Sequence, residues 1–191
     1  GLPNVLSGGS GNDVLVGGTG ADTFVGGPGT DTVSYAYITS TTTPVVADID
    51  AVADDGVAGE RDNIRTDVEN LTGSSSNDTL TGSDVNNVIT GGNGNDSING
   101  GAGDDTVNGE IGNDTVIGGP GEDGLDGGLG NDTGQGGDGD DSLVGGSGSD
   151  SLDGGTGIDE CDTEQAETRN ASCDLLTAAA LRPYYTRVSG Q

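Results

Sequence analysis

The amino-acid sequence predicts an all-β solenoid built from short strands that stack on one another. A nine-residue unit occurs three times from Gly8, and then ten times without insertion or deletion from Gly73 to Asp162. Glycine holds the first position in all thirteen units, aspartate holds the sixth in twelve, and an apolar or thiol side chain holds the eighth in all but one. Self-similarity at a fixed period indicates a repeat architecture. Because a flexible linker has no reason to keep phase over such a length, the pattern favours stacked repeats.

Composition taken alone would instead indicate a disordered polyelectrolyte. The chain has 191 residues, of which 40 are glycine, and its formal net charge is −28, from 33 acidic and five basic residues. Such a chain normally buries too little apolar surface to offset its conformational entropy. The charge also argues against binding to nucleic acid or to an anionic membrane, and no apolar stretch approaches membrane-spanning length. A solvated Gly/Asp tail is therefore the alternative that the periodicity has to outweigh.

The repeated unit resembles a known family. Its pattern, GG-x-G-x-D-x-U-x with U a large apolar residue, occurs for example as GGNGNDSIN (91–99) and GGAGDDTVN (100–108), and it is similar to the RTX nonapeptide repeat. The resemblance covers more than half of the chain and implies a calcium-stabilised, right-handed parallel β-roll. In such a roll the first six residues of a unit form a turn and the last three form a short strand. Two units then make one coil, and each unit lies directly beneath the unit after next.

Each position of the unit has a physical reason in that arrangement. Glycine at positions one, two and four would permit positive φ and let neighbouring turns approach closely. Asparagine, frequent at position five, tolerates left-handed backbone conformations better than most residues. Position eight should point inward and positions seven and nine outward, as in a strand with a period of two. At Gly134, where position eight lacks a side chain, we expect a local void or a pinching of the two walls. The residues expected inward are Leu15, Phe24, Val33, Leu80, Ile89, Ile98, Val107, Val116, Leu125, Leu143 and Leu152.

Aspartate at position six supplies one hard anionic oxygen donor from every turn. Carboxylates stacked along one edge repel one another unless a cation lies between them, and calcium accepts six to eight oxygen ligands, backbone carbonyls included. The predicted side-chain ligands are Asp13, Asp22, Asp31, Asp78, Asp96, Asp105, Asp114, Asp123, Asp132, Asp141, Asp150 and Asp159. The predicted carbonyl ligands belong to Gly9, Gly11, Gly27, Gly29, Gly92, Gly94, Gly101, Gly103, Gly112, Gly119, Gly121, Gly128, Gly130, Gly137, Gly139, Gly146 and Gly148.

The stacking sets the number of ions, which we expect to be about eight to ten. The gap beside Asn87 is doubtful, because unit 82–90 has lost its carboxylate and two of its glycines. Asp13 above Asp31 adds one site, and Asp22 requires a partner beyond the repeats. One aliphatic side chain for every nine residues is too little burial to fold the chain by itself. We therefore expect an unfolded chain without calcium and a folded one at millimolar calcium.

Residues 35–72 interrupt the phase, and we expect them to form enlarged coils of the same roll. Val45, Ala47 and Ile49 alternate with polar or outward positions, which favours a strand. Leu71 falls at position eight of a degenerate unit, 64–72. The acidic residues of the excursion could bind another calcium ion, but a solvated loop is the hypothesis that we favour, because they lack the spacing of an EF-hand. They are Asp48, Asp50, Asp54, Asp55 and Glu60.

The C-terminal segment contains both cysteines. Cys161 occupies the inward position of the last unit, and Cys173 follows after a polar loop. Two free buried thiols are one possibility, and a disulfide that pins a cap over the open end of the roll is the one we expect. A disulfide implies an oxidising compartment, which favours a cleaved N-terminal signal over the type I export that the resemblance implies. Residues 174–181 can form a short helix, and Tyr184 and Tyr185 could cover the end of the roll. The expected segments of one continuous domain are 1–34, 35–72, 73–162 and 163–191.

Catalysis is not expected. The chain has no histidine, which removes the common zinc sites and the Ser-His-Asp and Cys-His arrangements. Two functional hypotheses remain. The first is a complete bacterial structural protein, secreted or at the cell surface, that serves as an adhesive, sheath or filament subunit and associates end to end or with a cell wall. The second is a calcium-dependent folding and secretion module of a larger exported enzyme or toxin. A lead before the first unit and a cap after the last favour the first.

Overall fold

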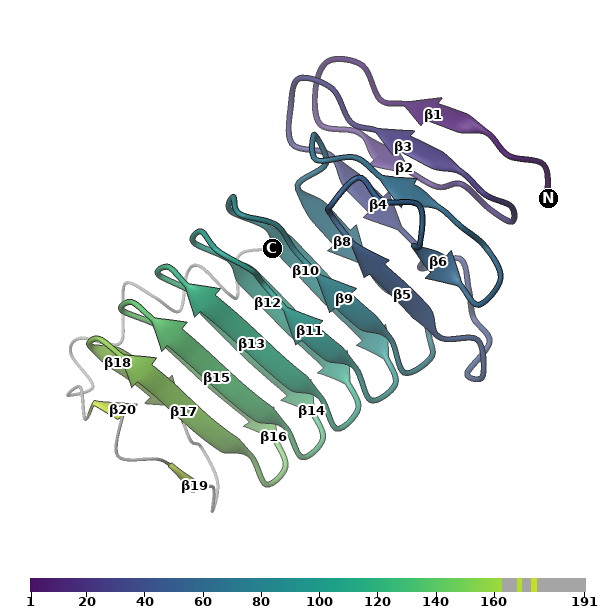
Figure 1. The fold of residues 1–191 in the computed structure, drawn as a ribbon. Helices are drawn as coiled ribbons and strands as arrows, with labels where there is room; N and C mark the ends of the chain where they lie inside the picture. The colour runs from purple at the N-terminus through teal and green to yellow at the C-terminus, as the bar shows by residue number, and fades with distance from the viewer. Residues whose placement is uncertain (163–167, 170–172, 175–191) are drawn as a thin grey trace.

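The protein is an all-β solenoid of about nine turns in the computed structural model, which describes residues 1–162, 168–169 and 173–174. Within those residues no helix occurs, and therefore none that could cross a membrane. Figure 1 shows the strands as successive parallel rungs between β1 at one end and β18 at the other. The predicted fold class is confirmed. The helix expected over 174–181 and the two adjacent tyrosines lie outside the described residues, except for Asp174, which belongs to a strand.

Two walls of parallel strands face each other along the solenoid (Figure 1). One wall is a single nine-stranded sheet, in the order β2 (Val14–Leu15), β4 (Thr32–Ser34), β8 (Asn70–Thr72), β10 (Val88–Asn93), β12 (Thr106–Ile111), β14 (Gly124–Leu129), β16 (Ser142–Ser147), β18 (Asp159–Asp162) and β20 (Cys173–Asp174).

The other wall is divided into two sheets. The first contains β1 (Val5–Ser7), β3 (Thr23–Val25) and β7 (Asn63–Ile64). The second contains β6 (Gly56–Val57), β5 (Val45–Asp48), β9 (Thr79–Thr81), β11 (Ser97–Asn99), β13 (Thr115–Pro120), β15 (Thr133–Asp138), β17 (Ser151–Thr156) and β19 (Thr168–Arg169). All strand pairings in the described part of the chain are parallel except that of β5 with β6, which is antiparallel, as is an isolated bridge between Asp55 and Asp62; the repeat pattern predicted neither.

The strand register confirms that each unit lies on the unit after next. Val88 pairs with Thr106, and Thr106 pairs with Gly124. Many strands are longer than the expected three residues, however. From β12 to β17 they cover six residues, because positions one to three of the following unit continue the parallel ladder, as the pairing of Gly128 with Gly146 shows. The turn proper is therefore only positions four to six.

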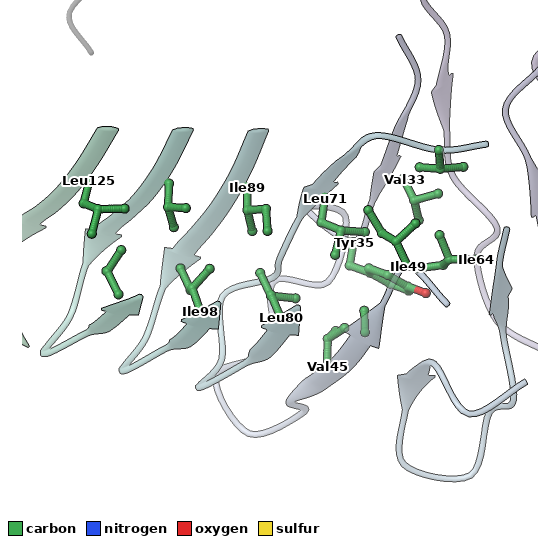
Figure 2. Packing of buried hydrophobic residues seen from close by; sticks show 14 of the residues in the cluster. Val33, Tyr35, Val45, Ile49, Ile64, Leu71, Leu80, Ile89, Ile98 and Leu125 are labelled. Atoms are coloured by element: carbon green, nitrogen blue, oxygen red, sulfur yellow. The ribbon is translucent and has the colours of Figure 1, made fainter. Parts of the chain in front are cut away.

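Position eight forms the core, as predicted. Every apolar residue expected inward is at most 7% exposed, and the flanking positions alternate outward. Figure 2 shows Leu80, Ile89 and Ile98 meeting between the walls. Gly134 pairs with Val116 on one side and Leu152 on the other. The ends of Leu152 and Leu143 approach to 2.9 and 3.5 Å of the place that a Cβ on Gly134 would take, so the neighbouring leucines occupy much of the expected void.

The enlarged coil buries more apolar side chains than one repeat does. Tyr35 is 1% exposed and packs edge-on against Phe24, with ring centroids 6.4 Å apart. Its hydroxyl donates a hydrogen bond of 3.0 Å to Oδ2 of Asp62, which is itself fully buried. Ile49 and Ile64 pack in the same cluster (Figure 2). Since β8 of this segment pairs with both β4 and β10, the nine-stranded wall runs through the excursion without a gap.

Candidate metal centre

The aspartates at position six form a ladder along each edge of the roll. The main-chain N–H of each donates to Oδ1 of the aspartate 18 residues later, at 2.7 to 3.0 Å. One edge joins Asp78, Asp96, Asp114, Asp132 and Asp150, and the other joins Asn87, Asp105, Asp123, Asp141 and Asp159. The position-six residues of successive coils are therefore stacked, as expected. In each step, Oδ1 of one aspartate accepts a hydrogen bond from the main chain of the coil before it.

The second carboxylate oxygen is buried and has no hydrogen-bond partner at most of these positions. A buried anionic oxygen without a partner is costly, and in proteins such groups are paired or bind metals. A hard cation between turns is the group that such oxygens suit, and calcium tolerates the mixed geometry best. The aspartates with such an Oδ2 atom are Asp13, Asp22, Asp31, Asp96, Asp105, Asp114, Asp123, Asp132, Asp141 and Asp150.

Glycine at position one leaves room for these oxygens. A Cβ on Gly109 would lie only 2.5 Å from Oδ2 of Asp114 and 2.6 Å from the main-chain oxygen of Gly127 in the next coil. This glycine does not have positive φ, contrary to the sequence-based expectation. Its requirement is steric: a side chain would fill the space where a carboxylate and a carbonyl converge. The position-one carbonyls were not among the predicted ligands, and no sequence signal distinguishes them from the other glycine carbonyls.

Glycines at positions two and four do have positive φ, including all those whose carbonyls are predicted ligands. At Gly119, with φ 123°, a Cβ would collide with the main-chain oxygen of Gly101 in the preceding coil. These glycines therefore let the main chain of one turn lie against the carbonyl oxygens of the preceding turn. Glu110 replaces glycine at position two of unit 109–117, and it keeps the positive φ, 71°, although it has a side chain.

Asparagine at position five has a role other than the expected one. None of these residues has positive φ in the described part of the chain. Instead, Oδ1 of Asn95 accepts a hydrogen bond of 2.8 Å from the main chain of Asn113, and Oδ1 of Asn113 accepts one of 2.7 Å from Asn131. This ladder is exposed and runs in the opposite direction to the aspartate ladder, so each turn is tied to both neighbours.

The electrostatics of the ladder aspartates suit a cation site. Burial away from water raises the pKa of Asp96, Asp105 and Asp141 to about 7; neighbouring carboxylates contribute to the increase, and the main-chain donor opposes it. Burial likewise raises the pKa of Asp114 and Asp123. A bound cation would reverse these shifts, because it favours the charged form.

Two turns in the middle of the chain are satisfied without a cation. Both oxygens of Asp78 accept hydrogen bonds from Ser74: Oδ2 from its main-chain N–H at 2.5 Å and Oδ1 from its hydroxyl at 2.9 Å. Asn87 accepts at Oδ1 from the main chain of Ser83 at 2.7 Å. Serine replaces glycine at position two in both units. That Asp78 binds calcium stays a prediction, and its surroundings differ from those of the other ladder aspartates.

Within the interruption lie the residues on which the ladders of the N-terminal coils end, and the repeat pattern does not contain them. Asp22 donates from its main chain to Oδ1 of Asp62 at 2.8 Å, and Asp31 donates to Oε2 of Glu69 at 2.8 Å. Asn4, one coil before Asp22, occupies the equivalent of position six, and its main chain donates to Oδ1 of Asp22. Sequence reasoning identified the frame of Leu71 but not these ligand-type residues. The spacing acid-x-apolar, in Asp62–Ile64 and Glu69–Leu71, is the signal that could have identified them.

The acidic residues of the excursion mostly hold the main chain. Oxygens of Asp48, Asp54 and Asp55 lie within 4.8 Å of one another. Asp55, however, accepts from the main chain of Asp48 at 2.7 Å and of Ile64 at 3.0 Å, and its two oxygens are both used. Burial raises the pKa of Asp55 to about 7. Glu60 accepts from Gly20, in a neighbouring coil, at 3.0 Å.

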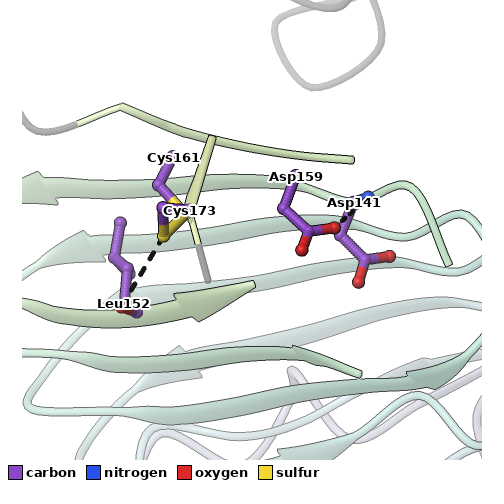
Figure 3. Close-up of a disulfide and its surroundings, with 5 residues drawn as sticks. All are labelled: Asp141, Leu152, Asp159, Cys161 and Cys173. Carbon is purple, nitrogen blue, oxygen red and sulfur yellow. Dashed lines mark hydrogen bonds between the residues drawn. A yellow bond between two sulfur atoms is a disulfide. The ribbon is translucent and has the colours of Figure 1, made fainter. Parts of the chain in front are cut away.

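The last coil is closed by a covalent bond. Cys161 and Cys173 form a disulfide with their Cα atoms 5.7 Å apart, so the predicted pairing is confirmed. Figure 3 shows it beside Leu152 and near the final step of one ladder, where the main chain of Asp141 donates to Asp159. Cys161 is only 6% exposed, as expected for position eight.

The family comparison agrees with this geometry. A model of the RTX calcium-binding nonapeptide repeat matches residues 3–33, 72–107, 90–125, 99–134 and 126–161, together more than half of the chain. A comparison with curated proteins gave no match. The repeat is a structural calcium-binding unit and not a catalytic one, and it is typical of proteins that bacteria secrete. With its nonapeptide frame, stacked coils and rows of buried aspartates, the chain belongs to the RTX calcium-binding repeat family.

Proposed function

We propose that this chain is a secreted structural protein whose roll folds on extracellular calcium and serves as an adhesive, sheath or filament subunit. The observation that carries the calcium dependence is the row of buried aspartate oxygens without partners on both edges. Free calcium is abundant outside cells, and sites of moderate affinity are typical of extracellular modules. Binding free energy then becomes folding free energy, because the site does not exist in the unfolded chain.

The ions are proposed to lie between successive turns, about eight to ten in all. Each would be held by aspartate oxygens of position six and by main-chain carbonyls of the facing turns. The positive φ of the predicted glycines and the space beside the position-one glycines support this placement. Nine divalent ions would neutralise about two thirds of the net charge of −28, which lowers the self-repulsion of the folded chain.

Self-association is the part of the proposal that concerns the structural role. β1 and β2 are terminal strands of their sheets, so each has one edge without a neighbouring strand among the described residues. Leu2, Val5 and Val14 are 81, 74 and 69% exposed at this end. Strand edges of this kind are templates for pairing with another chain. The disulfide at the other end suits an oxidising, extracellular location.

The second candidate function is a folding and secretion module of a larger exported enzyme or toxin. The family match supports it equally, since the repeat is a module of secreted proteins. The intact mass of the native protein distinguishes the two: a mass close to 18.6 kDa supports the separate subunit, whereas a much larger one supports the module.

Far-ultraviolet circular dichroism tests the calcium dependence common to both candidates. In excess chelator we expect a coil spectrum, which converts cooperatively to a β spectrum on addition of calcium but not of equimolar magnesium. A folded spectrum in chelator at neutral pH would contradict the proposal. Sedimentation velocity of the calcium-loaded protein, over a range of concentrations, then tests end-to-end association.

A further inference from the structure

Three asparagines of the roll are followed directly by glycine. They are Asn93, Asn99 and Asn108, in the successive units 91–99 and 100–108. In an Asn–Gly pair the main-chain nitrogen of the glycine can attack the side-chain amide of the asparagine with little hindrance, because glycine has no Cβ and its backbone rotates freely. The asparagines at position five, such as Asn113, are followed by aspartate, whose side chain hinders this attack.

The folded roll holds the attacking nitrogens in its ladders. The main-chain N–H of Gly94 donates to the carbonyl of Ile111 at 2.7 Å, and that of Gly100 donates to the carbonyl of Ile117 at 2.8 Å. Gly109 lies inside β12, which pairs with a strand on each side. Ring closure requires the glycine nitrogen to turn toward the side chain of the preceding asparagine. A nitrogen that donates to the next coil cannot do so unless the ladder first opens locally.

The side chains of Asn99 and Asn108 are also held. Oδ1 of Asn99 accepts from the main chain of Gly101 at 3.2 Å, and Oδ1 of Asn108 accepts from Glu110 at 2.9 Å. Both asparagines occupy the outward position nine, where Asn99 is exposed and Asn108 is partly exposed. Water therefore reaches them in the folded roll, and the fold opposes the reaction through geometry and not through burial.

A rearranged link at position nine does not fit the roll. Isoaspartate carries the main chain through its own Cβ, so it inserts one carbon atom before the position-one glycine that follows. Those glycines have no spare room: a Cβ on Gly100 would collide with Oδ2 of Asp105, and one on Gly109 would lie 2.5 Å from Oδ2 of Asp114. The longer main chain would also move the N–H of Gly100 out of its place in the ladder.

We propose that Asn93, Asn99 and Asn108 are deamidation sites that react in the calcium-free chain and are protected in the calcium-loaded roll. The glycine nitrogen bonds to Cγ, the bond from Cγ to Nδ2 breaks, and the nitrogen's proton leaves with the amide as ammonia. Water then opens the cyclic imide to aspartate or isoaspartate, so that one water is consumed for each ammonia released. A chain that remains without calcium thus loses its ability to fold. This inference rests on the calcium-dependent folding proposed above.

Three samples of the full chain test the inference: one in saturating calcium, one in excess chelator, and one in concentrated urea with calcium. Peptide mapping by mass spectrometry gives the deamidated fraction at each asparagine and separates aspartate from isoaspartate. Circular dichroism at the start shows which samples are folded. Gln135 is the internal control, since it lies in the same outward row as Asn99 and also precedes a glycine, but its longer side chain closes a ring far more slowly.

We expect the three Asn–Gly pairs to react at least about tenfold more slowly in calcium than in urea, because only the locally opened fraction reacts. The chelator sample should behave as the urea sample does. When chain aged in chelator is returned to calcium, the β signal that it fails to recover should match its isoaspartate content. The variant with Asn93→Ser, Asn99→Gln and Asn108→Gln should recover its signal, since Ser75 and Gln135 fill the same positions in other units.

Equal rates in folded and in urea-unfolded chain would overturn the inference, and so would full recovery of the β signal by a chain rich in isoaspartate. A chelator sample that is folded at the start would instead refute the calcium-dependent folding. In that case the comparison of calcium with urea still decides whether the fold protects these asparagines.

Discussion

The main-chain N–H of Asp96 donates a hydrogen bond of 2.7 Å to Oδ1 of Asp114, one coil further along the roll. Asp114 in turn donates to Asp132 at 2.8 Å. The same carboxylate therefore holds the preceding turn with one oxygen and leaves the other, buried, for a cation. Each ladder aspartate thus accepts a main-chain hydrogen bond and is also a candidate calcium ligand. Two different substitutions of the same aspartate can separate these two roles.

Asp114→Asn and Asp114→Ala should differ in their effects. The asparagine can still accept from Asp96 but loses the charge, so we expect a higher calcium midpoint with an unchanged fold at saturation. The alanine also loses a hydrogen bond to a charged acceptor, worth about 1.5–3 kcal/mol. Circular dichroism during calcium titration measures both. Asp13→Ala, in the first coil, should shift the midpoint less than Asp114→Ala, and equal shifts would argue against ions shared between stacked turns.

Glu110→Gly should stabilise the calcium-loaded roll. Glu110 has φ 71°, a left-handed conformation that costs an L-residue about 1–2 kcal/mol and that glycine adopts freely. We therefore expect a higher melting temperature at saturating calcium. Glu122→Gly is the control. It removes the same charge from an exposed residue, but Glu122 does not have positive φ. A gain of equal size in the control would assign the effect to charge and not to the backbone.

Gly134→Ala should lower the calcium midpoint, whereas Gly134→Val should give no further gain. Gly134 lies in ordinary strand, where alanine is favoured over glycine by about 0.5–1 kcal/mol. The flexible end of Leu152, 2.9 Å from the added Cβ, can move slightly, but it already occupies the space that larger groups would need. A clearly better result with valine would mean that the walls leave an open void.

The response to pH should have opposite signs with and without calcium. The pKa of Asp96, Asp105 and Asp141 is raised from 3.8 to about 7, so the metal-free folded state binds more protons than the unfolded chain between these values. In chelator the unfolded chain predominates at neutral pH; the stability of the metal-free folded state relative to it is greatest below about pH 4 and falls as the pH rises through 7, so any β signal in chelator should appear at low pH. With calcium, protons compete for the same oxygens, so the calcium midpoint should rise as the pH falls from about 8 to 5. Circular dichroism over this pH range, in chelator and during calcium titration, measures the two responses. If both had the same sign, the raised aspartate pKa values would not belong to calcium ligands.

The turns of units 73–81 and 82–90, in which serine donates to the position-six side chain, should stay folded at lower calcium concentrations than the repeats that follow. Ser74 bonds to both oxygens of Asp78, and Ser76 donates from its main chain to the Ser74 hydroxyl at 3.1 Å. Hydrogen exchange during calcium depletion should show protection lost over 91–159 before 73–90. Ser74→Ala should lower the stability of this turn by about 1–2 kcal/mol and abolish the difference in protection between the two segments. Ser97→Ala, at an exposed strand position, should do neither. Simultaneous loss in the unaltered chain would contradict calcium-independent sealing.

The sequence by itself determined the stacking offset of the repeats and the face that each strand turns inward. The nine-residue period defined the all-β solenoid, the register of each unit on the unit after next, and the inward side chains from Leu15 to Leu152. The same period placed Cys161 at an inward position, where it forms the disulfide with Cys173. These are local consequences of a strand with alternating sides and of one stacking offset, so a single chain carries enough information to predict them.

Only the tertiary structure decided what happens where neighbours in space are not 18 residues apart. Asp22 meets Asp62 at a separation of 40 residues, and Asp31 meets Glu69 at 38, so no periodic pattern connects them. The sealing of Asp78 by Ser74 replaces a cation with hydroxyl and main-chain donors, which the nonapeptide pattern cannot distinguish from a weakened site. Likewise the position-one glycines are required by oxygens of another residue and another coil, because the space beside a residue is set by its contacts and not by its own conformation.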